Sequence, residues 1–264
     1  MSTLSGKITK SFYNSMHKYF DLVIKGWFVL NGRKKQGEGI PLFLITIAGI
    51  LQALACWIIA EFFHYFFSGS VTVGSSSIPT GISFGAALVA SIIIVAALAY
   101  TDRGKNLSAL SWTGDFFGKW QNSKYEEAAI TEHYNVLAMN AVLLCKTLCI
   151  ASLISKGHSF WIIYVIALSY AAMTSGMSKL GTFAKNDEPD FETFTVVGAF
   201  IIITCLFHQH FIPAVICIVI AFFLAKFIFT FIIKKFEHMN EELIRAQAEF
   251  IQCILLMAGL IFIR

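Results

Sequence analysis

Long apolar runs dominate this chain, and polar residues gather in a few segments between them. A helix needs about 20 apolar residues to cross the hydrocarbon core of a bilayer. The pattern therefore predicts an all-α fold, a polytopic membrane helix bundle with about seven transmembrane helices. Residues 68–81, rich in Ser and Gly and without charge, are expected to be a linker. The predicted spans are residues 41–67, 81–100, 134–154, 158–174, 193–207, 210–233 and 246–263.

Composition agrees with a membrane protein and excludes an ordinary soluble domain. Of the 264 residues, 57% are hydrophobic and 14% are charged, and the mean hydropathy is +0.70. A soluble fold of this length has too little interior for so many apolar side chains. The net charge of +4 does not indicate a nucleic-acid partner, because basic residues in membrane proteins mainly orient the chain.

Residues 1–39 form a basic segment ahead of the helical domain predicted for residues 40–264. They lack the compact apolar region and cleavage site of a signal peptide. Apolar and aromatic side chains recur at helical spacing among seven Lys and Arg, which predicts an amphipathic helix on an anionic membrane surface. A solvated basic tail is the alternative, but it would not require these aromatic residues.

Lys and Arg are distributed unevenly between the two sides of the predicted bundle. With the N-terminus inside, the inner segments carry 7, 4, 2 and 3 of the 20 basic residues. The outer side carries only Lys156 and Arg264, and Lys146 and Lys226 lie within spans. Because basic residues collect on the cytoplasmic side, the N-terminus is predicted to be cytoplasmic.

Cysteine and histidine patterns give no metal or disulfide site. All six Cys lie within apolar runs without paired spacing or His neighbours, so we interpret them as packing residues. His208 and His210 flank Gln209 in a short turn on the outer side, with no acidic residue nearby. Metal binding is therefore not expected there.

The longest polar segment, residues 100–134, is predicted to be a cytoplasmic loop that carries the chemistry. Glu132 opens the third span, and Glu242 lies two helical turns before Glu249, so the latter two are expected to share a helix face. Carboxylates at membrane depth are unfavourable unless they are paired or metal-bound. Mg²⁺ bridged to a phosphate suits such an oxygen-rich site. The alternative is a set of charged loops that are simply solvated.

Lys146 lies in the middle of the third predicted span. A cation at that depth normally pairs with an acid or lines a polar cavity. Glu132 is too many turns away on the same helix to reach it. We therefore expect a partner for Lys146 from another span.

The polar segment resembles a signature of membrane transferases of the cobalamin synthase family (adenosylcobinamide-GDP ribazoletransferase). The family block His-x-Asp-Gly-Leu-Ala-Asp-x-x-Asp-Gly falls on residues 106–116, NLSALSWTGDF, and the block Met-Lys-Asp-Ser-Arg falls on residues 130–134, ITEHY. Residues 39–59 resemble the family's Phe-Pro-Leu-x-Gly span. Residues 234–252 resemble a last block, Thr-Gly-Asp-x-x-Gly-Ala-x-x-Glu-x-x-Glu. The order is the same over most of the chain.

This register assigns residues to family positions. Asp115, Glu132 and Glu242 take Asp positions, which implies that they hold Mg²⁺. Glu249 takes the first Glu of the last block, as a general base or a residue that orients a metal ligand. Lys146 corresponds to an intramembrane Lys that is often seen in the family.

The chain departs from the family at several signature positions. The first and second signature Asp fall on Ser108 and Trp112, the signature His falls on Asn106, and the Arg of the second block falls on Tyr134. If the signature Asp hold metal, about half of the ligands are missing here. Asp102 or Glu126, nearby in the sequence, could substitute.

The resemblance implies that a hydroxyl of α-ribazole, free or phosphorylated, attacks GDP-activated cobinamide and releases GMP. Mg²⁺ would stabilise the developing negative charge on the phosphates. Lys105, Lys119 and Lys124 are candidates for phosphate contacts, with ordinary interfacial lysines as the alternative. His133 is a candidate general base, and the alternative is a boundary histidine at headgroup level.

The expected partners are thus a nucleotide-activated small molecule and the lipid bilayer, in a bacterial inner (cytoplasmic) membrane. Two other functions stay open. One is a non-catalytic scaffold or subunit that retains the fold. The other is a small-molecule transporter, although the spans show no internal repeat and few polar residues. The sequence also leaves open whether the chain forms a homo-oligomer.

Overall fold

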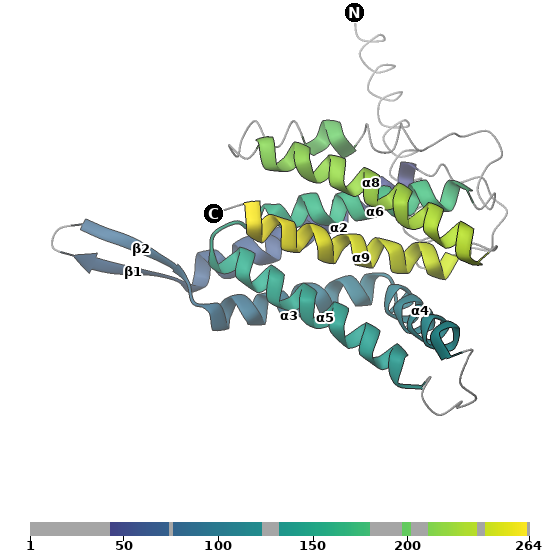
Figure 1. Ribbon diagram of the computed structural model, residues 1–264. Helices are drawn as coiled ribbons and strands as arrows, with labels where there is room; N and C mark the ends of the chain where they lie inside the picture. Colours follow the sequence, from purple (N-terminus) through teal and green to yellow (C-terminus); the bar gives the residue numbers. More distant parts are fainter. Residues whose placement is uncertain are drawn as a thin grey trace, which may run out of the picture.

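A computed structural model describes residues 43–73, 76–122, 132–179, 197–201, 211–236 and 241–262 (Figure 1). These residues form a bundle of helices with one β-hairpin, so the prediction of a helical bundle is confirmed. The elements in order are α2 (Phe43–Phe67), β1 (Ser68–Val73), β2 (Ser76–Ile82), α3 (Phe84–Thr101), α4 (Lys105–Asn122), α5 (Glu132–Ser155), α6 (Trp161–Lys179), α8 (Phe211–Phe236) and α9 (Glu241–Phe262).

The helices α2, α3, α5, α8 and α9 are long and apolar enough to cross a membrane, which makes five candidate spans in the described part of the chain. The protein is thus an integral membrane protein. The apolar part of α6, Trp161–Met177, is shorter. Six predicted spans coincide with helices. Of the seventh, residues 193–207, only residues 197–201 are described, and they are helical. The predicted interfacial segment, residues 1–39, lies outside the described residues.

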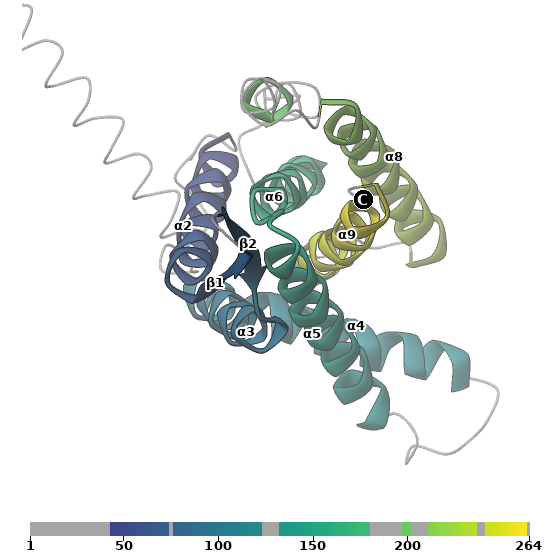
Figure 2. The same ribbon diagram turned by 90° about the vertical axis from the view of Figure 1, so that its left-hand side faces the viewer.

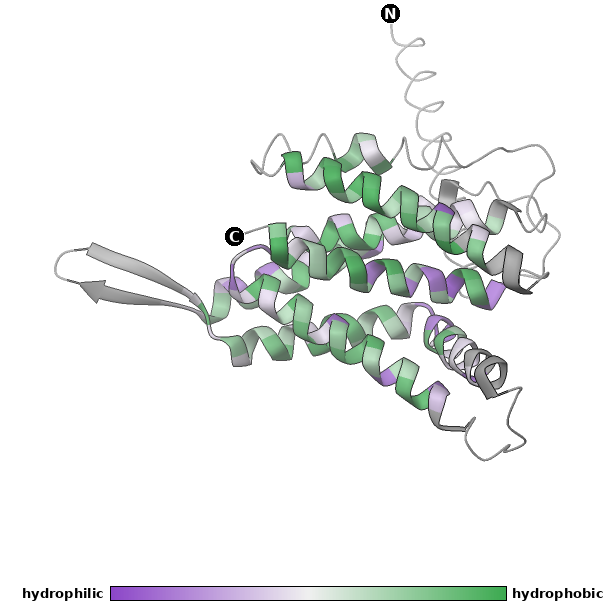
Figure 3. Cartoon of the chain, viewed as in Figure 1, coloured by the Kyte–Doolittle hydropathy of each residue, from purple (hydrophilic) through white to green (hydrophobic). Residues whose placement is uncertain are grey.

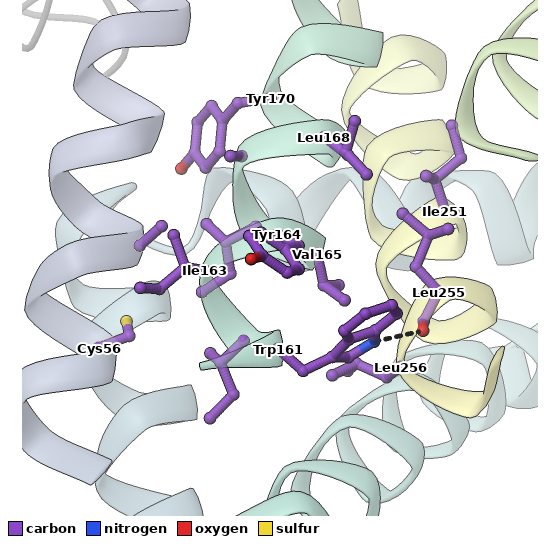
Figure 4. Close-up of a cluster of buried hydrophobic side chains, with 14 of the residues drawn as sticks. Cys56, Trp161, Ile163, Tyr164, Val165, Leu168, Tyr170, Ile251, Leu255 and Leu256 are labelled. Carbon is purple, nitrogen blue, oxygen red and sulfur yellow. Dashed lines mark hydrogen bonds between the residues drawn. The ribbon is translucent and has the colours of Figure 1, made fainter. Parts of the chain in front are cut away.

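Helix α6 lies in the centre of the bundle, with α2 on one side and α8 and α9 on the other (Figure 2). Every residue from Trp161 to Met177 is buried, as expected for a helix that is apolar on all sides. Trp161 packs with Leu255 and Leu256 of α9, and its indole Nε1 donates to the Leu255 carbonyl at 3.3 Å (Figure 4).

The segment expected to be a linker is instead a β-hairpin. Strands β1 and β2 pair antiparallel, with a bulge next to Gly69 and Ser70. The hairpin extends away from one end of the bundle (Figure 1). Ser83 then caps α3, because its hydroxyl accepts from the Ala86 backbone N–H at 3.3 Å.

The polar segment expected to be a loop is largely helix α4, at the opposite end of the bundle from the hairpin (Figure 1). A turn at residues 102–104 joins α3 to α4. Gly104 has a φ of 69° and Arg103 a φ of 57°, a left-handed conformation that is unfavourable for a residue with a side chain. The Asp102 carboxylate fixes this turn by accepting from the Gly104 backbone N–H at 2.8 Å.

Candidate functional site

Five buried polar side chains, from three helices and the α3–α4 turn, meet inside the α4 end of the bundle. We call them the polar centre. Each is at most 6% exposed, and hydrophilic residues are concentrated in this half of α9 (Figure 3). The members are Asp102 of the α3–α4 turn, Asn106 of α4, Lys146 of α5, and Arg245 and Glu249 of α9.

An ion pair joins α5 to α9 within the polar centre. Lys146 Nζ lies 2.7 Å from Glu249 Oε2, and both residues are 4% exposed. The expectation that Lys146 pairs with an acid from another span is confirmed. Removing two charges from water is unfavourable unless each finds a close partner, so this contact fixes how α5 and α9 meet.

Asn106 of α4 is hydrogen-bonded to both α9 members of the polar centre, Glu249 and Arg245. Its Nδ2 donates to Glu249 Oε1 at 3.0 Å, and its Oδ1 accepts from Arg245 Nη1 at 3.4 Å. Arg245 also donates to Glu241 Oε1, from Nη2 at 2.6 Å and from Nε at 2.9 Å. Both oxygens of Glu249 are therefore engaged, one by an ammonium group and the other by an amide.

Helical spacing and small neighbours explain why these side chains meet. Glu241, Arg245 and Glu249 follow one another at intervals of four residues and so lie along one face of α9. Ala109 of α4 and Ala246 of α9 are fully or almost fully buried in a small apolar cluster beside the polar centre. Such small residues let helices approach closely in a membrane.

A second chain of hydrogen bonds adjoins the polar centre. The Tyr170 hydroxyl of α6 donates to Gln52 Oε1 of α2, and Gln52 Nε2 donates to the Thr101 hydroxyl of α3. Thr101 in turn donates to the Leu98 carbonyl at 2.8 Å. Thr101 directly precedes Asp102 in the sequence. The chain of hydrogen bonds from Tyr170 to Thr101 therefore ends next to the polar centre.

Among the predicted site residues whose side chains the structure describes, Glu249 lies in the polar centre, and so does Asp102, the suggested substitute ligand. Asp115 of α4 and Lys105 at the start of α4 are half-buried, and Glu242 at the start of α9 is exposed. The sequence placed Glu242 and Glu249 on one helix face, yet only Glu249 is enclosed by other helices. The side chains of Lys119, Glu132 and His133, and the whole of Lys124, lie outside the described residues.

No group of three His, Cys, Asp or Glu side chains is placed to hold a metal ion within the described ranges. The side chain of Glu132 is not part of those ranges. Asp115 and Glu242 alone are too few ligands for Mg²⁺ in an all-protein site. The described residues therefore do not by themselves form the Mg²⁺ site that the family resemblance implies.

Sequence reasoning did not identify Arg245 as part of a site, and it considered Asn106 only as a departure from the family signature. One signal was available for Arg245. It lies four residues before Glu249 at the start of an apolar run, which is the spacing of a charged pair on one helix face. No local signal connects Asn106 to α9, because that contact joins residues 143 positions apart.

Asp102 makes the stability of the protein depend on pH. Burial, and then the charge of Glu249, raise the pKa of Asp102 from 3.8 to about 6. The folded protein therefore keeps this proton at pH values at which the unfolded chain has lost it. The resulting stabilisation is present below 3.8 and is lost as the pH rises to about 6.

Asp102→Asn is expected to remove this pH dependence, because an amide cannot ionise but can still accept from Gly104. At pH 7 the variant should have a higher free energy of unfolding than the wild type. Unfolding in mixed micelles between pH 4 and pH 7 measures both proteins. Parallel pH profiles for the two would contradict the prediction.

Comparison of the chain with protein-family models, with curated proteins and with solved structures gives no match.

Proposed function

We propose that this protein is a diverged membrane transferase of the cobalamin synthase type, in a bacterial inner membrane with its N-terminus in the cytoplasm. It joins α-ribazole, or its phosphate, to GDP-activated cobinamide and releases GMP. The polar centre and α4 then lie on the cytoplasmic side, where the nucleotide-activated substrate is available. The distribution of Lys and Arg supports this orientation.

One observation supports the proposal most directly. The resemblance assigned Asn106, Lys146 and Glu249 to three separate positions, far apart in the sequence and without reference to any structure. These three side chains meet, with Glu249 2.7 Å from Lys146 and 3.0 Å from Asn106. Convergence of independently assigned positions supports common ancestry of the fold.

Within this proposal Glu249 acts as a positioning residue. Both oxygens of Glu249 are engaged, one by Lys146 and the other by Asn106, so neither is left free to contact a substrate. Its contacts to Lys146 and Asn106 hold α4 in place against α5 and α9. Asp115 and Lys105, on the more exposed part of α4, are then available to a phosphorylated substrate.

Release of GMP tests the proposal. The purified protein in lipid nanodiscs, supplied with GDP-cobinamide, α-ribazole and Mg²⁺, is expected to release GMP. Asp115→Asn should lower the rate at least about tenfold, as loss of a metal-site residue commonly does. Glu61→Gln is the matched control at the other end of the bundle. Glu61 there accepts from Trp57 and Ser159, and the amide oxygen of Gln preserves an acceptor.

A non-catalytic scaffold that retains the fold is the second candidate. The charges of the polar centre pair with one another, as expected of groups that hold helices together. Ser108 and Trp112, exposed on α4, also stand at positions where the family has acids. Folded protein that releases no GMP under the same conditions would overturn the transferase proposal and favour this candidate.

A further inference from the structure

A recess with a volume of about 210 Å³ lies between α2 and α3. Its walls are almost entirely apolar, and Ala55 and Ala97 leave room because their side chains are small. Gln52 and Thr101 are its polar lining residues. Gln52 donates to the Thr101 hydroxyl and accepts from the Tyr170 hydroxyl, so the recess offers an apolar surface rather than a binding site for a polar molecule.

The position of the recess determines what can enter it. Both α2 and α3 are candidate membrane spans, and Ala55 and Leu51 on its rim are exposed, Leu51 by 48%. An exposed apolar surface at this depth faces hydrocarbon. A flexible hydrocarbon chain matches such a recess, whereas water would find few free hydrogen-bonding partners there.

The recess ends next to basic residues at headgroup level. The span of α3 ends at Thr101, and Arg103 and Lys105 follow within four residues. Arg103 is exposed and has the left-handed φ of 57°, a strained conformation of the kind found at binding sites. Asp102, the acid between them, is buried and bonded to the Gly104 N–H. Among the described residues of this turn, the exposed charge is therefore positive.

We propose that this corner binds an anionic phospholipid, with one acyl chain in the α2–α3 recess and the phosphate against Arg103. Two independent features support the assignment, namely the lipid-facing apolar recess and the basic turn at its headgroup end. Basic residues near the surface attract anionic lipids. The site does not depend on the transferase reaction and would be present in a non-catalytic protein as well.

Photolabelling tests the proposal. The full-length protein is placed in nanodiscs that contain phosphatidylglycerol or phosphatidylcholine with a diazirine on the acyl chain. Phosphatidylglycerol is expected to label α2 and α3 preferentially. Ala97→Phe fills the recess and should abolish that labelling. The matched control is Ala96→Phe, because Ala96 is the neighbouring residue of α3 but lies on its exposed face outside the recess.

A second variant separates the headgroup from the acyl chain. Arg103→Gln should weaken phosphatidylglycerol labelling about fivefold, the equivalent of about 1 kcal/mol for one basic residue, and should leave phosphatidylcholine labelling unchanged. Lys156→Gln, exposed at the other end of the bundle, should change neither. Inorganic phosphate should not compete, since the acyl chain provides part of the affinity.

Labelling that persists in Ala97→Phe, or that does not distinguish the two lipids, would overturn the proposal. Circular dichroism and gel filtration establish whether each variant folds. If Ala97→Phe does not fold, the effect of the exposed Arg103→Gln substitution on lipid preference decides the question.

Discussion

Replacement of Lys146 by Met is expected to lower the free energy of unfolding by about 3–5 kcal/mol. Met is similar in length and apolar, so it fills the space of Lys146 but leaves the Glu249 carboxylate buried with only Asn106 as a partner. Breaking a buried ion pair from one side is more harmful than removing both charges. Reversible unfolding in mixed micelles measures the loss.

Two further variants interpret the result. Lys146→Met combined with Glu249→Gln should recover most of the stability, because no unpaired charge remains and the amide can still bond to Asn106. Lys226→Met is the matched control. Lys226 also lies within a span but is exposed on α8, where it contacts the Phe222 ring at 5.3 Å. The Lys226→Met substitution should lower the free energy of unfolding by less than about 1 kcal/mol.

Equal decreases in the free energy of unfolding for Lys146→Met and Lys226→Met would show that the ion pair does not stabilise the fold.

Gly114→Ala is expected to destabilise the protein by about 1–3 kcal/mol or more. A Cβ atom at Gly114 of α4 would lie 2.6 Å from the Tyr134 carbonyl oxygen and 2.9 Å from Asn135 Cα of α5. These are backbone atoms, so no side-chain rotation can relieve the overlap. The start of α5 and α4 must therefore move apart, which should also weaken the Asn106 contacts to α9.

Gly85→Ala is the control for this substitution. Gly85 also lies in a helix, α3, but a Cβ atom there meets no atom within 4 Å. Because Ala favours helix more than Gly does, the variant should be neutral or stabilised by up to about 1 kcal/mol. Unfolding measurements in the same micelles compare both variants. A Gly114→Ala protein as stable as Gly85→Ala would mean that α4 and α5 are not closely packed.

The spans could be predicted from the sequence because the length of an apolar run is a local property. Helices at residues 84–101 and 211–236, for example, follow directly from their composition. The hairpin was missed, although the alternation of Val71 and Val73 before Gly74 and Ser75 is a hairpin signal. The polarity of residues 105–122 predicts a loop, but these residues form an amphipathic helix that packs on α5 and α9.

The candidate site was only partly predictable, for a related reason. A charged lysine within a span is unfavourable in hydrocarbon unless it is paired. The sequence therefore predicts a partner for Lys146. The identity of the acidic partner depends on how α5 and α9 pack. The sequence contains several acids that could pair with Lys146. The inward direction of Asn106 and Asp102 likewise depends on the turn at residues 102–104. Tertiary packing, rather than local pattern, brings these groups together.

The distance in sequence between Lys146 and Glu249 also has a consequence for biogenesis. The two residues are 103 positions apart, and α9 is the last helix described. During synthesis, α5 is complete long before α9, so the ion pair between Lys146 and Glu249 can form only after α9 has been made.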